Sequence, residues 1–240
     1  MQEIIRPSTV LPANRKLFTF TTSDGFKLIG EVATPIGPIE ATILCFHPNP
    51  SQGGMMDSHV YKKASNRLPA MAGVQIVRIN TRGTSSEQGT SEGVFDNGEA
   101  EKEDVIAAIK YVVEELKVDR FWVMGWSFGT DLSLRYATDP HVLGLILLSP
   151  PLQRTSQAEL EFWARDGRPI TALVPEFDTF LNPDQARIGF APIPHLTLIP
   201  VEGAKHLWVG EPAVYRVLTE IVNIVAPQHL PLPEEYEVSN

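Results

Sequence analysis

The sequence of 240 residues predicts one domain with an α/β fold, in which helices cover both faces of a mostly parallel sheet. Two observations predict this class. Short apolar segments alternate with stretches whose apolar residues recur every three to four positions, and loops rich in Gly and Pro separate them. No internal repeat and no Pro-rich linker divides the chain before about Pro227, so we expect a single core.

The chain opens with two β-rich segments, Leu17–Thr21 and Phe26–Gly30, on either side of Ser23-Asp24-Gly25. An Asp-Gly pair between such segments is a strong hairpin signal, so we expect an antiparallel hairpin at the start of the sheet. Residues 1–16 contain two prolines and no periodicity, and we expect them to form a loosely attached leader.

Six further strands and five helices are predicted, which with the hairpin make an eight-stranded sheet. The strands are expected at Ala41–Phe46, Gln75–Asn80, Phe121–Gly125, Leu143–Ser149, Pro169–Val174 and Leu196–Pro200. The helices are expected at Asp57–Met71, Asn97–Leu116, Phe128–Ala137, Gln157–Arg165 and Pro212–Val225. The domain would then span residues 17–226, and residues 227–240 would be a tail whose packing the sequence leaves open.

Charge and cysteine content exclude several classes of function. Lys and Arg total 20 against 29 Asp and Glu, a net charge of −9, so no basic face for nucleic acid is expected. A single cysteine, Cys45, excludes a disulfide framework and fits a reducing compartment. The amino end lacks a signal-peptide pattern and no apolar stretch is long enough to cross a bilayer. We therefore expect a cytoplasmic protein, not bound to a membrane, and either monomeric or homodimeric.

The segment Gly125-Trp126-Ser127-Phe128-Gly129 directly follows an apolar strand and directly precedes a helix. This is the setting of a nucleophile elbow, in which small residues on both sides allow a tight turn that presents a serine hydroxyl. A chance match in a loop is the alternative, but it would not explain the strand before and the helix after. We predict that Ser127 is a nucleophile.

A serine hydroxyl needs a base to accept its proton. The last predicted strand ends at Pro200 and leads through Val201–Lys205 to His206, before the final helix. Ligand sites of parallel sheets lie at the carboxyl ends of strands, the edge that also carries Ser127. We predict that His206 is the base; the alternative is a histidine in a surface loop.

The base needs a carboxylate to orient it, and the loop after the preceding strand offers three. Asp178 is the predicted partner because it lies near the strand end and has phenylalanines at 177 and 180 to shield it from water. Glu176 and Asp184 are the alternatives, each expected to be a solvated loop charge.

The loop His47-Pro48-Asn49-Pro50 leaves another strand at the same edge. Prolines stiffen this loop and cannot donate hydrogen bonds, so we predict that the backbone N–H groups of Asn49 and Phe128 form an oxyanion hole. We expect His47 to hold the loop by hydrogen bonding rather than to serve as a second base. The remaining histidines lack metal-ligand spacing, and we predict no metal and no cofactor.

With serine, acid and histidine in this chain order, the sequence resembles the α/β-hydrolase superfamily over about Leu17 to Val225. The His47–Pro50 loop, followed by Gly53-Gly54, and Asn80-Thr81-Arg82-Gly83 are similar to small serine hydrolases with an HPxP loop, related to dienelactone hydrolase and peptidase-like esterases. The resemblance implies the α/β-hydrolase fold, with Arg82 and Gly83 shaping the loop under the catalytic histidine.

Residues 150–168 are much shorter than the lid domains of lipases and epoxide hydrolases. We therefore expect a minimal lid or none, and a small or extended soluble ester rather than a long acyl chain. Whether bulky aromatic residues line a substrate pocket or pack in the core stays open at this point. They are Trp126, Phe128, Trp163, Phe177 and Trp208.

The resulting hypothesis is a serine hydrolase that cleaves carboxylic esters or related small acyl substrates through an acyl-enzyme intermediate. The same fold also supports cleavage of thioester, amide and C–C bonds and cofactor-free peroxidation. A rival from another class is a protein that keeps the fold only for ligand or partner binding. Such a protein is expected to carry a broken triad, and here all three positions are intact.

Overall fold

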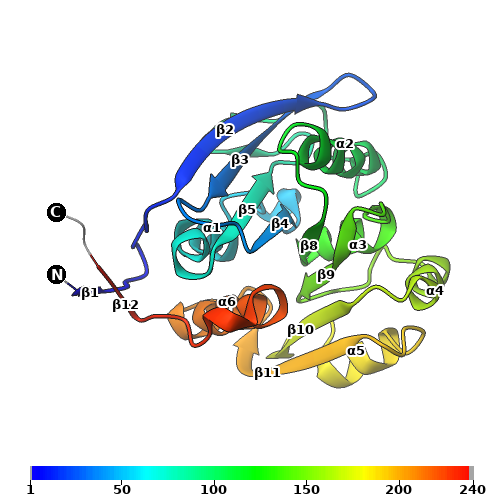
Figure 1. The fold of residues 1–240 in the computed structure, drawn as a ribbon. Helices are drawn as coiled ribbons and strands as arrows, with labels where there is room; N and C mark the ends of the chain where they lie inside the picture. Colours follow the sequence, from blue (N-terminus) through cyan, green and yellow to red (C-terminus); the bar gives the residue numbers. More distant parts are fainter. Residues whose placement is uncertain (1, 238–240) are drawn as a thin grey trace.

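The computed structural model describes residues 2–237, and an eight-stranded sheet runs through its centre (Figure 1). The strand order is β11-β10-β9-β8-β4-β5-β3-β2, and only the pairings of β3 with β2 and β5 are antiparallel. The strands are β2 (Asn14–Thr21), β3 (Lys27–Thr34), β4 (Ala41–Phe46), β5 (Val74–Ile79), β8 (Phe121–Trp126), β9 (Val142–Leu148), β10 (Ile170–Phe177) and β11 (Thr197–Lys205). The predicted sheet and its opening hairpin are confirmed.

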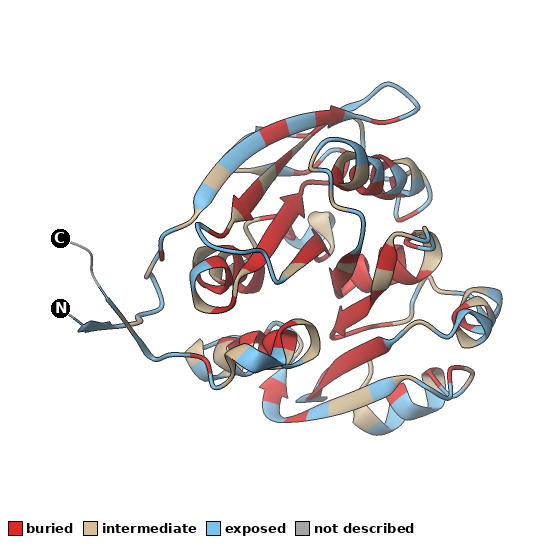
Figure 2. Cartoon of the chain, in the orientation of Figure 1, coloured by how far each residue is buried: buried red, intermediate tan, exposed pale blue. Residues whose placement is uncertain are grey.

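Helices cover both faces of the sheet, as predicted. They are α1 (His59–Ala72), α2 (Glu101–Glu114), α3 (Phe128–Tyr136), α4 (Gln157–Asp166), α5 (Pro183–Gly189) and α6 (Glu211–Val225), with the short 3₁₀ turns η1 (Pro50–Gln52) and η2 (Pro227–His229). One hydrophobic cluster joins α1 and α6 to one face, and a second joins α2, α3, α4 and α5 to the other. The central strands are accordingly buried along most of their length (Figure 2).

Strand β4 shows why the sequences of the central strands are nearly continuous runs of apolar residues. Ile43 and Cys45 belong to the cluster under α1 and α6, whereas Leu44 and Phe46 belong to the cluster on the other face. Successive side chains of a strand point to opposite faces, so a strand covered on both sides is apolar at every position.

Several strands extend beyond their predicted ends, and the extensions of β10 and β11 bear on the site. Strand β10 continues to Phe177 and β11 to Lys205, and these two residues pair with each other after a register shift near Pro175. Their apolar runs end earlier, at Val174 and Val201, because the last residues of both strands are largely exposed. The extra pairing carries the two loops that follow toward the same edge of the sheet.

Two helices differ from the prediction. Helix α2 begins at Glu101 instead of Asn97, because Asn97 and Gly98 have left-handed backbone conformations, with φ of 54° and 99°. Helix α5 was not predicted, since seven residues are too few to show helical periodicity. Its start carries a local signal: the side chains of Asn182 and Gln185 form a capping box.

The ends of the chain pair with each other. Strand β1 (Gln2–Ile4) and strand β12 (Glu235–Glu237) form an antiparallel ribbon beside α6 (Figure 1). The expected leader, residues 1–16, and tail, residues 227–240, therefore meet, and residues 14–16 lie within β2. Met1 and residues 238–240 lie outside the described part of the chain. A second ribbon, β6 (Ser85–Ser86) with β7 (Gly89–Thr90), follows β5.

The connection from β9 to β10 contains α4 and loops, so residues 149–169 form no lid domain. None of the helices in the described range 2–237 is long and apolar enough to cross a membrane.

Trp163 anchors α4 to the core. Its side chain is fully buried, its indole N–H donates to the carbonyl of Leu134 at 2.7 Å, and the guanidinium of Arg168 lies 4.8 Å from the ring centre. We expect Trp163→Ala to lower the free energy of unfolding by about 3–5 kcal/mol, because it leaves a cavity and an unpaired carbonyl.

Urea unfolding followed by circular dichroism measures this loss. The control is Val94→Ala, which removes an exposed apolar side chain and is expected to change stability by less than about 0.5 kcal/mol. A loss below about 1 kcal/mol for Trp163→Ala would contradict the anchoring role.

Candidate active site

Ser127 lies at a sharp turn between β8 and α3. Its backbone has φ of 51° and ψ of −117°, a region that residues with a side chain rarely adopt. The turn is held from within the helix, since the hydroxyl of Thr130 donates to the Ser127 carbonyl at 2.6 Å. The Ser127 N–H donates to Leu148 of β9 at 2.9 Å. These bonds present the serine side chain at the carboxyl end of the sheet.

Gly125 and Gly129 make this turn sterically possible. A Cβ on Gly125 would overlap the carbonyl of Gly129, and a Cβ on Gly129 would overlap the carbonyl of Phe46 at the end of β4. The first turn of α3 is therefore packed directly against the backbone that leads into the His47 loop. Only glycine permits this approach.

The structure brings together the three residues that the sequence singled out. The Nε2 atom of His206 lies 2.8 Å from the hydroxyl of Ser127, and its Nδ1 atom lies 2.8 Å from one carboxylate oxygen of Asp178 and 3.0 Å from the other. The network assigns the proton to Nδ1, which donates to the carboxylate, and leaves Nε2 free to accept from the serine. These residues come from three segments far apart in the chain.

The alternative acids lie elsewhere. Glu176 is exposed and accepts a hydrogen bond from the N–H of Gly203 at 2.8 Å. Asp184 is a surface residue of α5 that pairs with Arg187. Asp178, by contrast, is buried, and its carboxylate also accepts from the N–H of Phe180 at 2.8 Å. Among the three, only Asp178 contacts His206.

The loop of His206 is tied to the neighbouring strand ends through its own carbonyl. That carbonyl accepts from the indole N–H of Trp126 at 3.2 Å and from the hydroxyl of Ser149 at 3.0 Å. The ring of Phe180 packs on the imidazole, with 4.5 Å between the ring centres. The sequence analysis did not single out Ser149. Its place as a polar residue directly after the apolar strand β9 was the available signal.

The two predicted oxyanion donors come from the two segments that pack together at Gly129, the start of α3 and the chain that follows β4. Phe128 is the first residue of α3, so its N–H has no partner within the helix. Asn49 precedes η1, and its side chain accepts from the N–H of Ser51 at 2.9 Å. Within residues 2–237, no acceptor pairs with the N–H of Asn49 or that of Phe128. Both N–H groups are thus available to a ligand.

His47 is fully buried behind this loop. Its Nδ1–H donates to the carbonyl of Pro48 at 2.7 Å, and its Nε2 accepts from the N–H of Thr81 at 3.1 Å. Burial lowers the pKa of His47 to about 4, so the ring is neutral near pH 7. These contacts join the ends of β4 and β5 and are those of a residue that holds a loop.

The expectation for Arg82 was wrong. Its guanidinium pairs with Asp104 of α2 at 2.7 Å and with Asp24 in the β2–β3 turn at 3.0 Å. It therefore ties α2 to the opening hairpin and lies among these carboxylates, rather than under the loop of His206. The buried carboxylate of Asp104, seventeen residues before β8, instead holds the arginine against α2.

Four of the five aromatic residues in question pack in the core. Trp126, Phe128, Trp163 and Trp208 are buried, whereas Phe177 is exposed. Cys45 is buried as well, and burial raises the pKa of its thiol. Across residues 2–237, no group of three or more His, Cys, Asp or Glu side chains could hold a metal ion.

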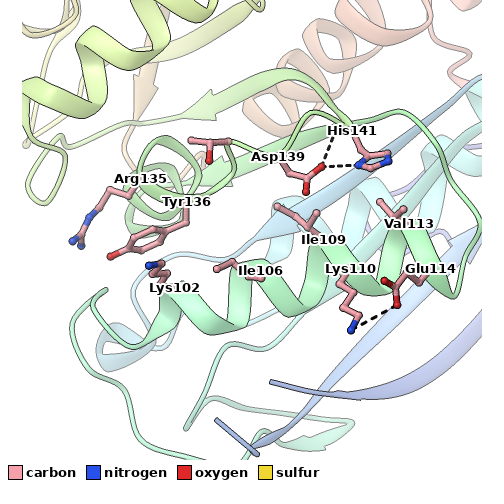
Figure 3. Close-up of a pocket in the computed structure, with 11 residues that line it drawn as sticks. Lys102, Ile106, Ile109, Lys110, Val113, Glu114, Arg135, Tyr136, Asp139 and His141 are labelled. Carbon is pink, nitrogen blue, oxygen red and sulfur yellow. Dashed lines mark hydrogen bonds and ion pairs between the residues drawn. The ribbon is translucent and has the colours of Figure 1, made fainter. Parts of the chain in front are cut away.

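A hollow of about 350 Å³ lies between α2 and the end of α3 with the segment that follows it (Figure 3). Ile106, Ile109 and Val113 form its apolar wall. Around them, Lys110 pairs with Glu114 and His141 with Asp139. None of the predicted site residues lines it. The candidate site is therefore the one at Ser127.

Comparisons with known proteins identify the family of this fold. A family model described as alpha/beta hydrolase fold matches residues 42–195. An uncharacterised protein of Rickettsia prowazekii is 26% identical over 163 residues, which cover 67% of this chain and 66% of that relative's own length.

Solved structures show the same fold. A serine hydrolase without a lid from Xanthomonas campestris aligns with a TM-score of 0.73 at 23% identity, over 92% of this chain and 99% of that one. An esterase from Pyrococcus furiosus aligns with a TM-score of 0.68 at 16% identity, over 92% of this chain and all of that one (100%).

The low pKa of His47 predicts a loss of stability in acid. The unfolded chain binds a proton at this histidine below its ordinary pKa of 6.5, but the folded protein resists protonation down to about pH 4. The contribution of the neutral His47 to the free energy of unfolding is therefore complete above pH 6.5. It falls as the pH drops toward 4, by at most about 3 kcal/mol.

Urea unfolding of His47→Gln between pH 4 and pH 7.5 measures this effect. We expect the variant to be less stable at pH 7.5 but to lose less stability on acidification than the natural protein. Val94→Ala, which changes an exposed apolar side chain and no titratable group, is the control and is expected to leave the pH dependence unchanged. Parallel pH curves for His47→Gln and the natural protein would contradict a neutral, buried His47.

Proposed function

The chain belongs to the alpha/beta hydrolase fold family, and we propose that it is a serine hydrolase that cleaves carboxylic esters or related small acyl substrates. One observation carries the proposal: Asp178, His206 and Ser127 are joined by two hydrogen bonds, each 2.8 Å long. A serine in a strained turn with a histidine and a buried carboxylate in line has the parts that nucleophilic catalysis requires.

In the first half of the proposed reaction, the Ser127 oxygen attacks the carbonyl carbon of the ester while Nε2 of His206 takes the hydroxyl proton. The N–H groups of Asn49 and Phe128 donate to the oxyanion that forms, and Asp178 stabilises the imidazolium. The tetrahedral intermediate then expels the alcohol. Its carbon–oxygen bond breaks, and His206 returns the proton to the leaving oxygen.

In the second half, water replaces the alcohol. His206 takes a proton from water, the hydroxide attacks the acyl carbon, and the bond to the Ser127 oxygen breaks as the histidine returns the proton to it. The products are a carboxylic acid and the unchanged enzyme. Every group in this sequence comes from the chain itself, so the proposed reaction requires no cofactor.

Two considerations favour esters within this fold. The structural neighbours from Xanthomonas campestris and Pyrococcus furiosus are described as a serine hydrolase without a lid and as an esterase. The connection between β9 and β10 is short, so the substrate meets Ser127 without a lid domain to enclose a long acyl chain. Small thioesters and activated amides fit the same chemistry and belong in the first substrate screen.

The rival proposal is a binding protein that keeps the fold without catalysis. It would not require Ser127 to be held in a strained conformation within hydrogen-bond distance of a histidine. A chemical probe of the serine separates the two proposals without knowledge of the substrate.

We expect a fluorophosphonate probe to label Ser127, because the probe reacts with serines that a neighbouring base activates. Mass spectrometry of the peptide that contains Ser127 reads the label. Ser127→Ala should remove the label, and His206→Ala should slow labelling at least about a hundredfold. Ser23→Ala, in the exposed turn between β2 and β3, is the matched control and should label at the natural rate.

Circular dichroism establishes that each variant is folded. Labelling that survives in Ser127→Ala would refute the assignment of the nucleophile. A folded natural protein that the probe does not label would refute the hydrolase and favour the binding protein.

A further inference from the structure

Large exposed apolar side chains gather beside His206 and Asp178. Phe177 and Phe180 flank Asp178 in sequence, and Leu207 and Val209 follow His206; all four are exposed. Phe180 is 38% and Leu207 is 55% accessible to solvent. Exposed apolar groups of this size cost free energy in water, so those that lie next to the catalytic pair are candidates for contact with an apolar part of the substrate.

Two of these residues lie next to the imidazole, Phe180 by a ring contact and Leu207 as the residue that follows His206 in the chain. The ring of Phe180 packs on His206 with 4.5 Å between ring centres, and the Phe180 N–H donates to Asp178 at 2.8 Å. Leu207 follows a residue whose carbonyl accepts two hydrogen bonds, from Trp126 and Ser149. The ring of Phe180 is thus placed by its contact with the imidazole, and the backbone of Leu207 by the bonds of the residue before it.

The other flank of Ser127 is polar. In the sheet, β4 lies on one side of β8, and β9, β10 and β11 lie on the other. The loop after β4 presents Asn49, Ser51 and Gln52, which are partly or fully exposed. The apolar residues follow β10 and β11. An ester bound at Ser127 thus meets a polar surface on one side and an apolar surface on the other.

The proposed chemistry decides which part of the ester meets the apolar side. His206 must deliver its proton to the leaving oxygen, so the alcohol portion extends from Ser127 toward the imidazole. Phe180 packs on the imidazole, and the exposed Leu207 is the next residue in the chain. We infer that the protein prefers esters whose alcohol portion is an apolar alkyl or aryl group that packs on Phe180 and Leu207, an inference that rests on the proposed function.

A series of n-alkyl acetates from methyl to hexyl tests this preference. The acetyl group is constant and the acidity of the alcohols is nearly so, so the series varies the apolar area alone. Complete burial of one methylene corresponds to about a fourfold gain in kcat/KM, and a surface that covers one side should give about twofold. We therefore expect hexyl acetate to exceed methyl acetate by about thirtyfold, measured as acetate release at constant pH.

The variants Leu207→Ser and Phe180→Ser should each lower the hexyl-to-methyl ratio at least about threefold. Because the ratio is taken within one variant, a change in the basal rate cancels. Both residues are exposed, and Leu207→Ser alone is sufficient if Phe180→Ser does not fold. The matched control is Ile36→Ser, which alters an exposed apolar residue in the loop before β4, at the opposite edge of the sheet, and should keep the natural ratio.

Methyl esters of acetic to hexanoic acid provide a second control, because they lengthen the acyl side only. Leu207→Ser should leave the dependence on acyl length unchanged. A flat alkyl acetate series, or a rise that both variants retain, would overturn the inference while the hydrolase stands. Absence of hydrolysis together with absence of fluorophosphonate labelling would instead overturn the proposed function, and the inference with it.

Discussion

The site depends on the close approach of two backbone segments, the first turn of α3 and the end of β4. Gly129 has room only for a hydrogen, since a Cβ there would overlap the carbonyl of Phe46. This contact sets the distance between the elbow that carries Ser127 and the loop that carries Asn49. The two N–H groups that would face an oxyanion come from these two segments, so a steric constraint on one glycine determines the electrostatics of the proposed reaction.

The elbow also positions the base. Trp126, the residue before Ser127, donates its indole N–H to the carbonyl of His206, and Ser149 at the end of β9 donates to the same carbonyl. The loop that carries His206 is therefore hydrogen-bonded both to the strand that carries the nucleophile and to the end of the neighbouring strand β9. The pairing of β10 with β11 up to Phe177 and Lys205 brings the loops of Asp178 and His206 together. Preorganisation of this kind reduces the rearrangement needed when charge develops at the serine.

Much of the fold could be predicted because burial leaves a periodic pattern in the sequence. The eight strands and the helices on both faces follow from that pattern, and Gly125 to Gly129 marks the elbow because its turn requires small residues at fixed spacing. The chain order of Ser127, Asp178 and His206 followed from strand ends that share one edge of the sheet. The roles of these three residues remain a proposal.

Other features depend on interactions that periodicity does not record. The β1–β12 ribbon joins the two ends of the chain, and α5 is too short for a periodic signal. Helix α2 starts late because Asn97 and Gly98 are left-handed, which residue type alone does not decide. The expectation that Arg82 shapes the loop under the histidine was mistaken, because its buried ion pair with Asp104 is a long-range contact. Likewise, the pattern could not separate the exposed Phe177 from the buried tryptophans.

The central claim is that Ser127 becomes covalently acylated, and rapid trapping of the acyl-enzyme tests it most directly. The protein is mixed with 4-nitrophenyl acetate, quenched in acid within the first turnovers and digested for mass spectrometry. The account predicts an acetyl group on the peptide that contains Ser127, at the residue itself, and none at the same position in Ser127→Ala. Ester turnover without acetylation of Ser127 would contradict the account. So would acetylation confined to other side chains that are acetylated equally in the Ser127→Ala variant.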